Sequence, residues 1–195
     1  MTLIPTPSQT VGPFLHLGLT DSGAVGCIAG EGVKGERIRL KCRVLDGEGA
    51  PVPDAMIELW QADADGYYAC QEDSRTGVTA PEFRGFGRMP TGDDGTCTFE
   101  TIKPARVPFP GGGLQAPHVN VSILGRGLLL RLCTRIYFAG DPANGADPGL
   151  ALVPENRRAT LMAQPDSSQQ NSSGQETFLF EIRLRGAGET VFFDW

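Results

Sequence analysis

Lysine and arginine never gather into a basic block in this sequence, and the formal net charge at pH 7 is −6. Proteins that bind nucleic acid or an anionic membrane usually present a basic patch, so the composition argues against both functions. Long apolar runs are also absent from the sequence, and the N-terminus lacks the basic and apolar regions of an export signal. We therefore expect a cytoplasmic protein without a membrane anchor.

Cysteine motifs are missing as well. The five cysteines are widely spaced, form no C-x-x-C pair and are odd in number, so they cannot all close into disulfides. Cys42, Cys97 and Cys133 each fall within a predicted strand, and no neighbouring His or Asn signature marks a nucleophile. We expect reduced thiols whose role is packing.

Long helices are not expected, because 26 glycines and 15 prolines interrupt the chain and leave short, alternating segments. In residues 38–44 apolar and basic residues alternate strictly, which is typical of a strand with one buried and one wet face. This reasoning predicts strands at residues 38–44, 56–61, 96–102, 118–124, 129–138, 178–184 and 190–193. Short strands separated by turns predict an all-β fold, a β-sandwich.

The rest of the chain is predicted to form one short helix and long loops. Pro154 stands at a favourable first-turn position for a helix over residues 155–163. Residues 164–175 are polar and rich in Ser and Gln, as in a surface loop. The length of 195 residues suits one globular domain, so we expect a single domain over residues 1–195.

Few side chains could bind a metal or carry acid–base chemistry. There are two histidines, His16 and His118, and three tyrosines, Tyr67, Tyr68 and Tyr137. A metal site built from this chain alone would need most of them.

His118 opens a predicted strand and shares one face with Asn120, because the i and i+2 side chains of a strand project together. A metal-binding pair has this spacing, but the neutral amide of Asn120 is a poor ligand for ferric iron. We therefore interpret His118 as a hydrogen-bonded histidine that stiffens a strand end, and His16 as structural too.

Arg126 stands between two glycines, whose small size leaves its guanidinium accessible to an anionic partner, although many such arginines are simply solvated. Asp63 and Asp65 begin a calcium-loop pattern whose other ligands are missing, so a turn is the better interpretation. From its residues alone, the chain is predicted to be an acidic β-sandwich without a self-sufficient active site.

Six segments resemble the intradiol ring-cleaving dioxygenase family, and within it the alpha chains of the two-chain enzymes that cleave protocatechuate. They are TPSQTVGPF at residues 6–14, ELWQADADG at 58–66, TIKP at 101–104, APHVN at 116–120, TRIYF at 134–138 and GETVFFDW at 188–195.

This resemblance implies that the chain holds no complete iron site. In the family the beta chain binds Fe(III) through two tyrosines, two histidines and a solvent hydroxide. The tyrosine positions correspond here to Tyr68 and Val107, and the histidine positions to His118 and Asn120. A family arginine just upstream is Gln115 here. Because valine has no donor atom, we expect a vestigial metal pocket and no catalytic residue in this chain alone.

The resemblance further implies that the chain lines the substrate pocket of a beta partner. Thr10, Gly12, Pro13 and Arg126 match the pocket-lining positions of alpha chains. Protocatechuate (3,4-dihydroxybenzoate) carries a carboxylate that a guanidinium would hold while O2 cleaves the ring to 3-carboxy-cis,cis-muconate. Residues 1–35 are expected to be irregular and to pack on the beta chain.

Two other interpretations stay open. A self-sufficient iron dioxygenase would need ligands such as Tyr67, Tyr68, His16 and His118. A non-catalytic binding module could share the sandwich, because a fold does not fix a function.

Overall fold

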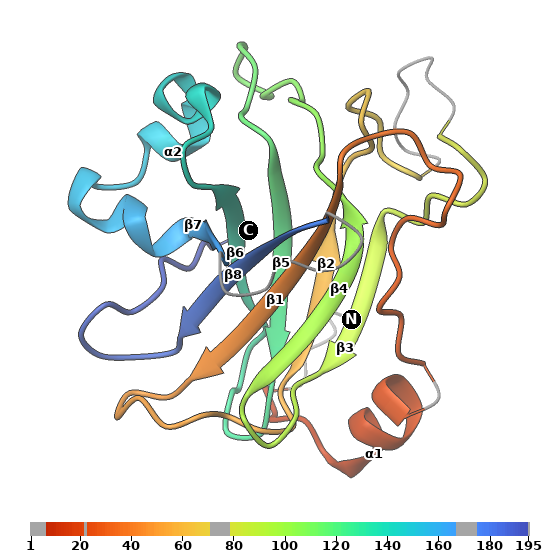
Figure 1. Ribbon diagram of the computed structural model, residues 1–195. Helices are drawn as coiled ribbons and strands as arrows, with labels where there is room; N and C mark the ends of the chain where they lie inside the picture. The colour runs from red at the N-terminus through yellow and green to blue at the C-terminus, as the bar shows by residue number, and fades with distance from the viewer. Residues whose placement is uncertain (1–6, 22, 71–78, 167–174, 195) are drawn as a thin grey trace, which may run out of the picture.

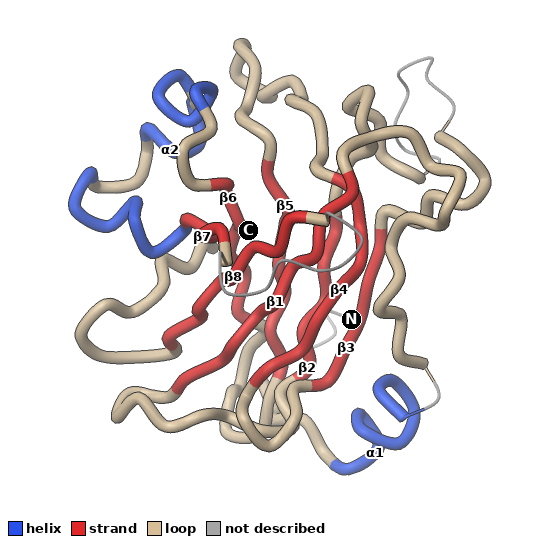
Figure 2. Tube along the Cα trace, in the orientation of Figure 1, coloured by secondary structure: helices blue, strands red, loops and turns tan. Residues whose placement is uncertain are grey.

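A single sheet of eight strands, nearly closed on itself, forms the frame of the protein (Figures 1 and 2). The computed structural model describes residues 7–21, 23–70, 79–166 and 175–194. The strands lie in the order β3-β2-β5-β6-β7-β8-β1-β4. Their bounds are β1 Arg37–Leu45, β2 Met56–Trp60, β3 Phe86–Pro90, β4 Thr96–Ile102, β5 His118–Leu124, β6 Leu132–Phe138, β7 Met162–Pro165 and β8 Glu176–Arg183.

The helical segments are all short and lie outside the sheet. They are α1 Pro13–Leu15, continued by the π-helical turn His16–Asp21, then the 3₁₀ helix Pro142–Ala146, α2 Pro148–Ala151 and the 3₁₀ helix Glu155–Leu161. No helix in the described ranges is long and apolar enough to cross a membrane.

Alternation along the strands builds the core. In β1 half-buried and buried positions alternate, so that Leu40 and Cys42 point inward while the basic residues next to them point out. The inward residues of β1, β4 and β8 meet those of β2, β5 and β6 in one apolar cluster that includes Ile57, Phe99 and Val121. Each such buried aliphatic or aromatic side chain contributes about 1.5–3 kcal/mol to folding. The predicted all-β, sandwich-like architecture is confirmed.

Five predicted strands match observed ones closely, and the sixth, β6, begins three residues later than predicted. Residues 190–193 form no strand, since only Phe193 makes an isolated bridge, to Cys133. The predicted helix over 155–163 is instead a 3₁₀ helix that ends at Leu161, because Met162 and Ala163 pair with strand β6. Residues 164 and 165 belong to β7, and residues 167–174 of the predicted loop lie outside the described ranges.

Strand β3 was missed because its sequence contains Gly87 and ends in Pro90, both of which disfavour strand assignment. The glycine has a packing reason. A Cβ placed on Gly87 would lie 2.7 Å from Cγ1 of Ile28 and 2.9 Å from Cδ1 of Phe99, and both side chains are fully buried. Gly87 thus permits the segment around Ile28 to lie directly on the sheet.

Replacing Gly87 by alanine should destabilise the fold by about 1–3 kcal/mol, because the added methyl group would force the closely packed core side chains to move. Gly92→Ala in the following turn is the matched control, since its Cβ would meet nothing closer than 3.8 Å. Denaturant unfolding of both variants measures the difference. A Gly87→Ala protein as stable as Gly92→Ala would contradict this packing of β3.

Candidate functional site

The N-terminal segment and the β5–β6 loop meet at the lower end of the molecule in Figure 1. The Thr10 hydroxyl accepts a hydrogen bond from the backbone N–H of Gly127 at 2.8 Å and donates one to the carbonyl of Gly125 at 3.4 Å. One side chain therefore bonds the backbone on both sides of Arg126. Gly127 has a φ of +88°, a conformation in which glycine is unstrained.

Gly12 and Pro13 follow directly and open helix α1. Pro13 occupies a first-turn position, where its missing N–H is no loss, and Leu15 N donates to the Gly12 carbonyl at 3.1 Å. Both residues are exposed, and Arg126 shows 74% of its side chain to solvent. The structure therefore brings the four predicted pocket-lining residues to one exposed end.

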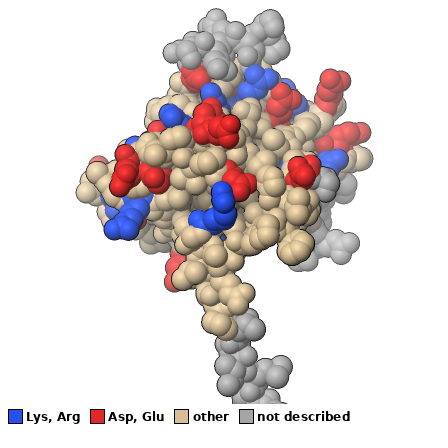
Figure 3. All heavy atoms as spheres, turned by 90° about the horizontal axis from the view of Figure 1, so that it is seen from below, with Lys and Arg blue, Asp and Glu red and all other residues tan. Residues whose placement is uncertain are grey.

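Apolar side chains on the same two segments are also exposed. They are Phe14, at 82% exposed, with Leu17, Leu129 and Leu130. Figure 3 shows this end of the molecule, where acidic and basic residues are scattered among uncharged ones. Exposed large apolar residues that lie together are typical of a surface that another protein covers.

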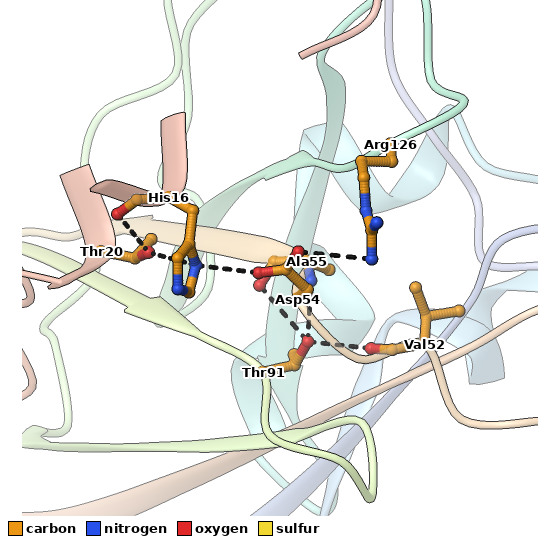
Figure 4. A network of polar contacts seen from close by, with 7 residues as sticks. All are labelled: His16, Thr20, Val52, Asp54, Ala55, Thr91 and Arg126. Carbon is orange, nitrogen blue, oxygen red and sulfur yellow. Dashed lines mark hydrogen bonds and ion pairs between the residues drawn. The ribbon is translucent and has the colours of Figure 1, made fainter. Parts of the chain in front are cut away.

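Arg126 is held by an acidic residue that sequence reasoning missed. Its Nη2 lies 3.4 Å from Oδ2 of Asp54, whose Oδ1 lies 2.9 Å from Nδ1 of His16 (Figure 4). No local pattern reveals this chain of contacts, because the three residues come from three distant segments.

The vestigial metal positions gather at the other end of strand β5. Val107 is buried, and its carbonyl accepts from Gln115 N at 2.8 Å. Tyr68 stacks on Trp60, with ring centroids 5.9 Å apart, and Trp60 is the strand neighbour of Asn120.

His118 is almost fully buried, with 3% of its surface exposed. Its Nδ1 lies 2.8 Å from the Ala116 carbonyl oxygen, while Nε2 is a buried atom without a hydrogen-bond partner. Burial, reinforced by the nearby cation of Arg135, lowers the pKa of His118 to about 4. The imidazole is therefore neutral at physiological pH. The predicted hydrogen-bonded position at the start of a strand is what the structure shows.

A guanidinium lies beside the vestigial positions. Arg135 Nε donates to Oδ1 of Asn120 at 3.0 Å, and its Nη1 donates to Oε1 of Gln115 at 2.7 Å. Gln115 in turn donates through Nε2 to the Pro108 carbonyl at 2.9 Å. Asn120 and Gln115, which are predicted to replace a histidine and an arginine of the family, are thus both bonded to one fixed cation.

The side chains of this pocket do not fit Fe(III). Val107 offers no donor, and the amide oxygen of Asn120 is already bonded to Arg135, whose positive charge repels a second cation. Tyr137 is fully buried with its hydroxyl donating to Asp147 Oδ1 at 3.3 Å, and burial raises the pKa of Tyr137 to about 12. A tyrosinate is therefore disfavoured there.

The structure also does not bring together the two histidines that a self-sufficient iron dioxygenase would need as ligands. His118 begins strand β5, whereas His16 lies beside the loop that follows the strand. Seven extended residues separate the two ends of β5 by roughly 20 Å. His16 and His118 therefore cannot bind the same ion.

The cysteines and the acidic turn behave as predicted. All five cysteines are free, and Cys42 faces Cys97 across the β1–β4 pair. The hydrogen bond between the Cys42 and Cys97 side chains, together with burial, favours the neutral thiol and raises the pKa of Cys42, so this thiol is a packing residue rather than a nucleophile. Asp63 caps a turn, where its Oδ1 accepts from the backbone N–H of Asp65 and Tyr67 at 2.9 Å each.

Comparisons with known proteins agree with this arrangement. A family model described as "Dioxygenase" matches residues 11–186. The protocatechuate 3,4-dioxygenase alpha chain of Burkholderia cepacia is 41% identical over 204 aligned residues, which cover 99% of this chain and 98% of that one. The beta chain from the same organism is 35% identical over 158 residues, covering 80% of this chain and 67% of the relative.

Among solved structures, 3-chlorocatechol 1,2-dioxygenase from Rhodococcus opacus 1CP superposes with a TM-score of 0.65 at 21% identity, covering 94% of this chain and 69% of that chain. This likeness concerns the fold. Together, fold and sequence define the class: the chain belongs to the intradiol dioxygenase family. Within the family, its nearly full-length similarity is to an alpha chain of protocatechuate 3,4-dioxygenase, as the sequence motifs predicted.

The buried, neutral state of His118 predicts a specific loss of stability in acid. Between its folded pKa of about 4 and the ordinary value of 6.5, the unfolded chain binds a proton that the folded chain does not. The contribution of His118 is therefore fully present above about pH 6.5 and is lost as the pH falls toward 4. Between pH 7 and pH 5 this loss amounts to about 2 kcal/mol.

His118→Gln removes the titrating group, so its free energy of unfolding should fall about 2 kcal/mol less than that of the native chain over the same interval. Denaturant titrations of the two proteins at pH 7 and pH 5 give the comparison. Identical pH dependence in the two proteins would show that folding does not lower the pKa of His118, and would contradict this account.

Proposed function

We propose that the chain is the alpha subunit of a heteromeric intradiol dioxygenase that cleaves protocatechuate with O2 to 3-carboxy-cis,cis-muconate. Two features support this function: the nearly full-length similarity to a protocatechuate 3,4-dioxygenase alpha chain, and the existence of a homologous beta chain. Intradiol dioxygenases are Fe(III) enzymes. We assign the Fe(III) to the beta chain, because the donor set of this chain does not fit the ion.

The observation that carries the proposal is the separation of the two sites. Thr10, Gly12, Pro13 and Arg126 lie together on an exposed end, roughly 20 Å along β5 from the vestigial pocket. They are too far away to act on a ligand held in that pocket. An exposed pocket wall at such a distance makes chemical sense if the remainder of the site belongs to another chain.

The role of this chain is to bind and orient the substrate. The guanidinium of Arg126 presents a planar fork of N–H donors, which matches the two oxygens of a carboxylate. In a protein of net charge −6, such a local cation is needed to hold an anion. Gly12 and Pro13 would form a rigid backbone wall, and Thr10 fixes the loop from which Arg126 projects.

The interface with the beta chain is proposed to include N-terminal residues 1–35, in a protein of one domain located in the cytoplasm. The prediction that this segment is irregular is wrong for Pro13–Asp21, which are helical. Within the described part of this segment, Phe14 and Leu17 are exposed in the isolated chain. Their burial by the beta chain would remove apolar surface from water and bring Arg126 to the substrate.

Arg126→Ala in the alpha–beta complex should raise KM for protocatechuate about ten- to hundredfold, because a charge-assisted contact to the carboxylate is lost. Iron content should not change. Arg131→Ala removes an exposed arginine from the same loop and is the matched control. Steady-state oxygen uptake and iron analysis give both quantities. An Arg126→Ala complex that loses iron while KM is unchanged would refute the assignment.

The chain purified alone should be colourless and inactive, whereas co-expression with the homologous beta chain should give a complex with ferric iron and protocatechuate-dependent oxygen uptake. Absorption spectra and oxygen-electrode traces of the two preparations test this. A coloured, active single chain would identify a self-sufficient iron enzyme. Failure of the two chains to co-purify would instead favour a non-catalytic module.

A further inference from the structure

Asp54 occupies a strained backbone position that its neighbours hold in place. It has a φ of +64° and is the only non-glycine residue with positive φ in the described part of the chain. The Thr91 hydroxyl donates to the Val52 carbonyl at 2.8 Å and accepts from Ala55 N at 2.9 Å (Figure 4). Asp54 N donates to the Thr91 carbonyl at 3.1 Å. Strain of this kind persists where the surroundings fix it, and it is concentrated at functional positions.

The carboxylate of Asp54 connects two segments that carry the proposed pocket wall. Oδ1 contacts Nδ1 of His16, in the helical turn that follows Gly12 and Pro13, at 2.9 Å. Oδ2 contacts Nη2 of Arg126 at 3.4 Å. Each oxygen therefore has a partner from a different segment, and the strained turn aims the carboxylate between them.

His16 acts as a donor in this network. The Thr20 hydroxyl donates its hydrogen to the His16 carbonyl at 2.9 Å, so it meets Nδ1, 3.1 Å away, as an acceptor. The Asp54 carboxylate is an acceptor too. Nδ1 therefore carries a hydrogen that it donates to Asp54, and this donation withdraws negative charge from the carboxylate. An anion approaching Arg126 consequently meets weaker repulsion from Asp54.

Asp54 engages one edge of the guanidinium and leaves the other donors of Arg126 available. Without a partner, a long side chain that is 74% exposed would sample many rotamers, and a ligand would have to order it on binding. Contact with a fixed carboxylate restricts the guanidinium in advance. Asp54 therefore orients the Arg126 guanidinium more than it competes with an anionic ligand for it.

We propose that Asp54, supported by His16, is a positioning residue that orients the Arg126 guanidinium toward the carboxylate of the substrate. It thereby contributes to the preference for a catechol that carries a carboxylate over one that lacks it. This inference rests on the proposed function of Arg126 as the group that binds the substrate carboxylate.

Asp54→Asn in the alpha–beta complex is the direct test. Asparagine tolerates the left-handed backbone and keeps the shape of the side chain, so the substitution removes mainly the charge. KM for protocatechuate should rise about fivefold with kcat unchanged, because the contact is that of a partly exposed ion pair. The inhibition constant of 4-hydroxybenzoate should rise by the same factor, whereas that of phenol, which lacks the carboxylate, should not change.

Asp65→Asn is the matched control, since it removes a carboxylate paired with Lys34 at 2.7 Å at the other end of the molecule. It should leave all three constants unchanged. Asp54→Asn should also add nothing in an Arg126→Ala background, because the residue acts through Arg126. A merely structural role of Asp54 would instead raise the constants in both backgrounds and for phenol as well.

The outcomes separate this inference from the function on which it rests. If Arg126→Ala leaves KM unchanged, the proposed function fails. If Arg126→Ala raises KM but Asp54→Asn leaves it unchanged or lowers it, Arg126 binds the carboxylate and the positioning role of Asp54 is wrong. Equal effects of Asp54→Asn on 4-hydroxybenzoate and phenol would also overturn it.

Discussion

Strand β5 is the constraint on which the functional arrangement depends. It pairs with β2 on one side and β6 on the other, so its length and direction are fixed by two ladders of hydrogen bonds. The vestigial pocket lies at its beginning and the Arg126 loop follows its end, roughly 20 Å away. Strand β5 therefore holds the vestigial pocket and the Arg126 loop too far apart to act on one ligand within this chain.

The chemistry at each end of β5 is consistent with that separation. At the beginning, Arg135 donates hydrogen bonds to Asn120 and Gln115 next to a buried, neutral His118. These polar contacts stabilise the pocket, and the positive charge in it is the guanidinium of Arg135 itself. At the far end, Arg126 is exposed and is restrained by a single carboxylate. A chain without a metal of its own thus presents an accessible cation to a site that lies outside it.

Sequence patterns predicted those parts that depend on local periodicity or on family motifs. The strict alternation of residues 38–44 predicted β1, because each inward residue enters one apolar core. Strand β3 escaped prediction because Gly87 reflects contact with the distant Ile28, not a turn. The family resemblance predicted that Thr10 and Arg126 line the same substrate pocket. The link from Asp54 to His16 was not, since it depends on a positive φ and on contacts across 38 residues of chain.

The central claim is that this chain supplies the cation that holds the carboxylate in a pocket whose metal another chain binds. A structure of the alpha–beta complex with 4-hydroxybenzoate tests it most directly. The account predicts an Arg126 guanidinium nitrogen at about 2.7–3.2 Å from a carboxylate oxygen of the inhibitor. An inhibitor whose carboxylate contacts only beta-chain residues, with Arg126 beyond the reach of a hydrogen bond or a bridging water, would contradict it.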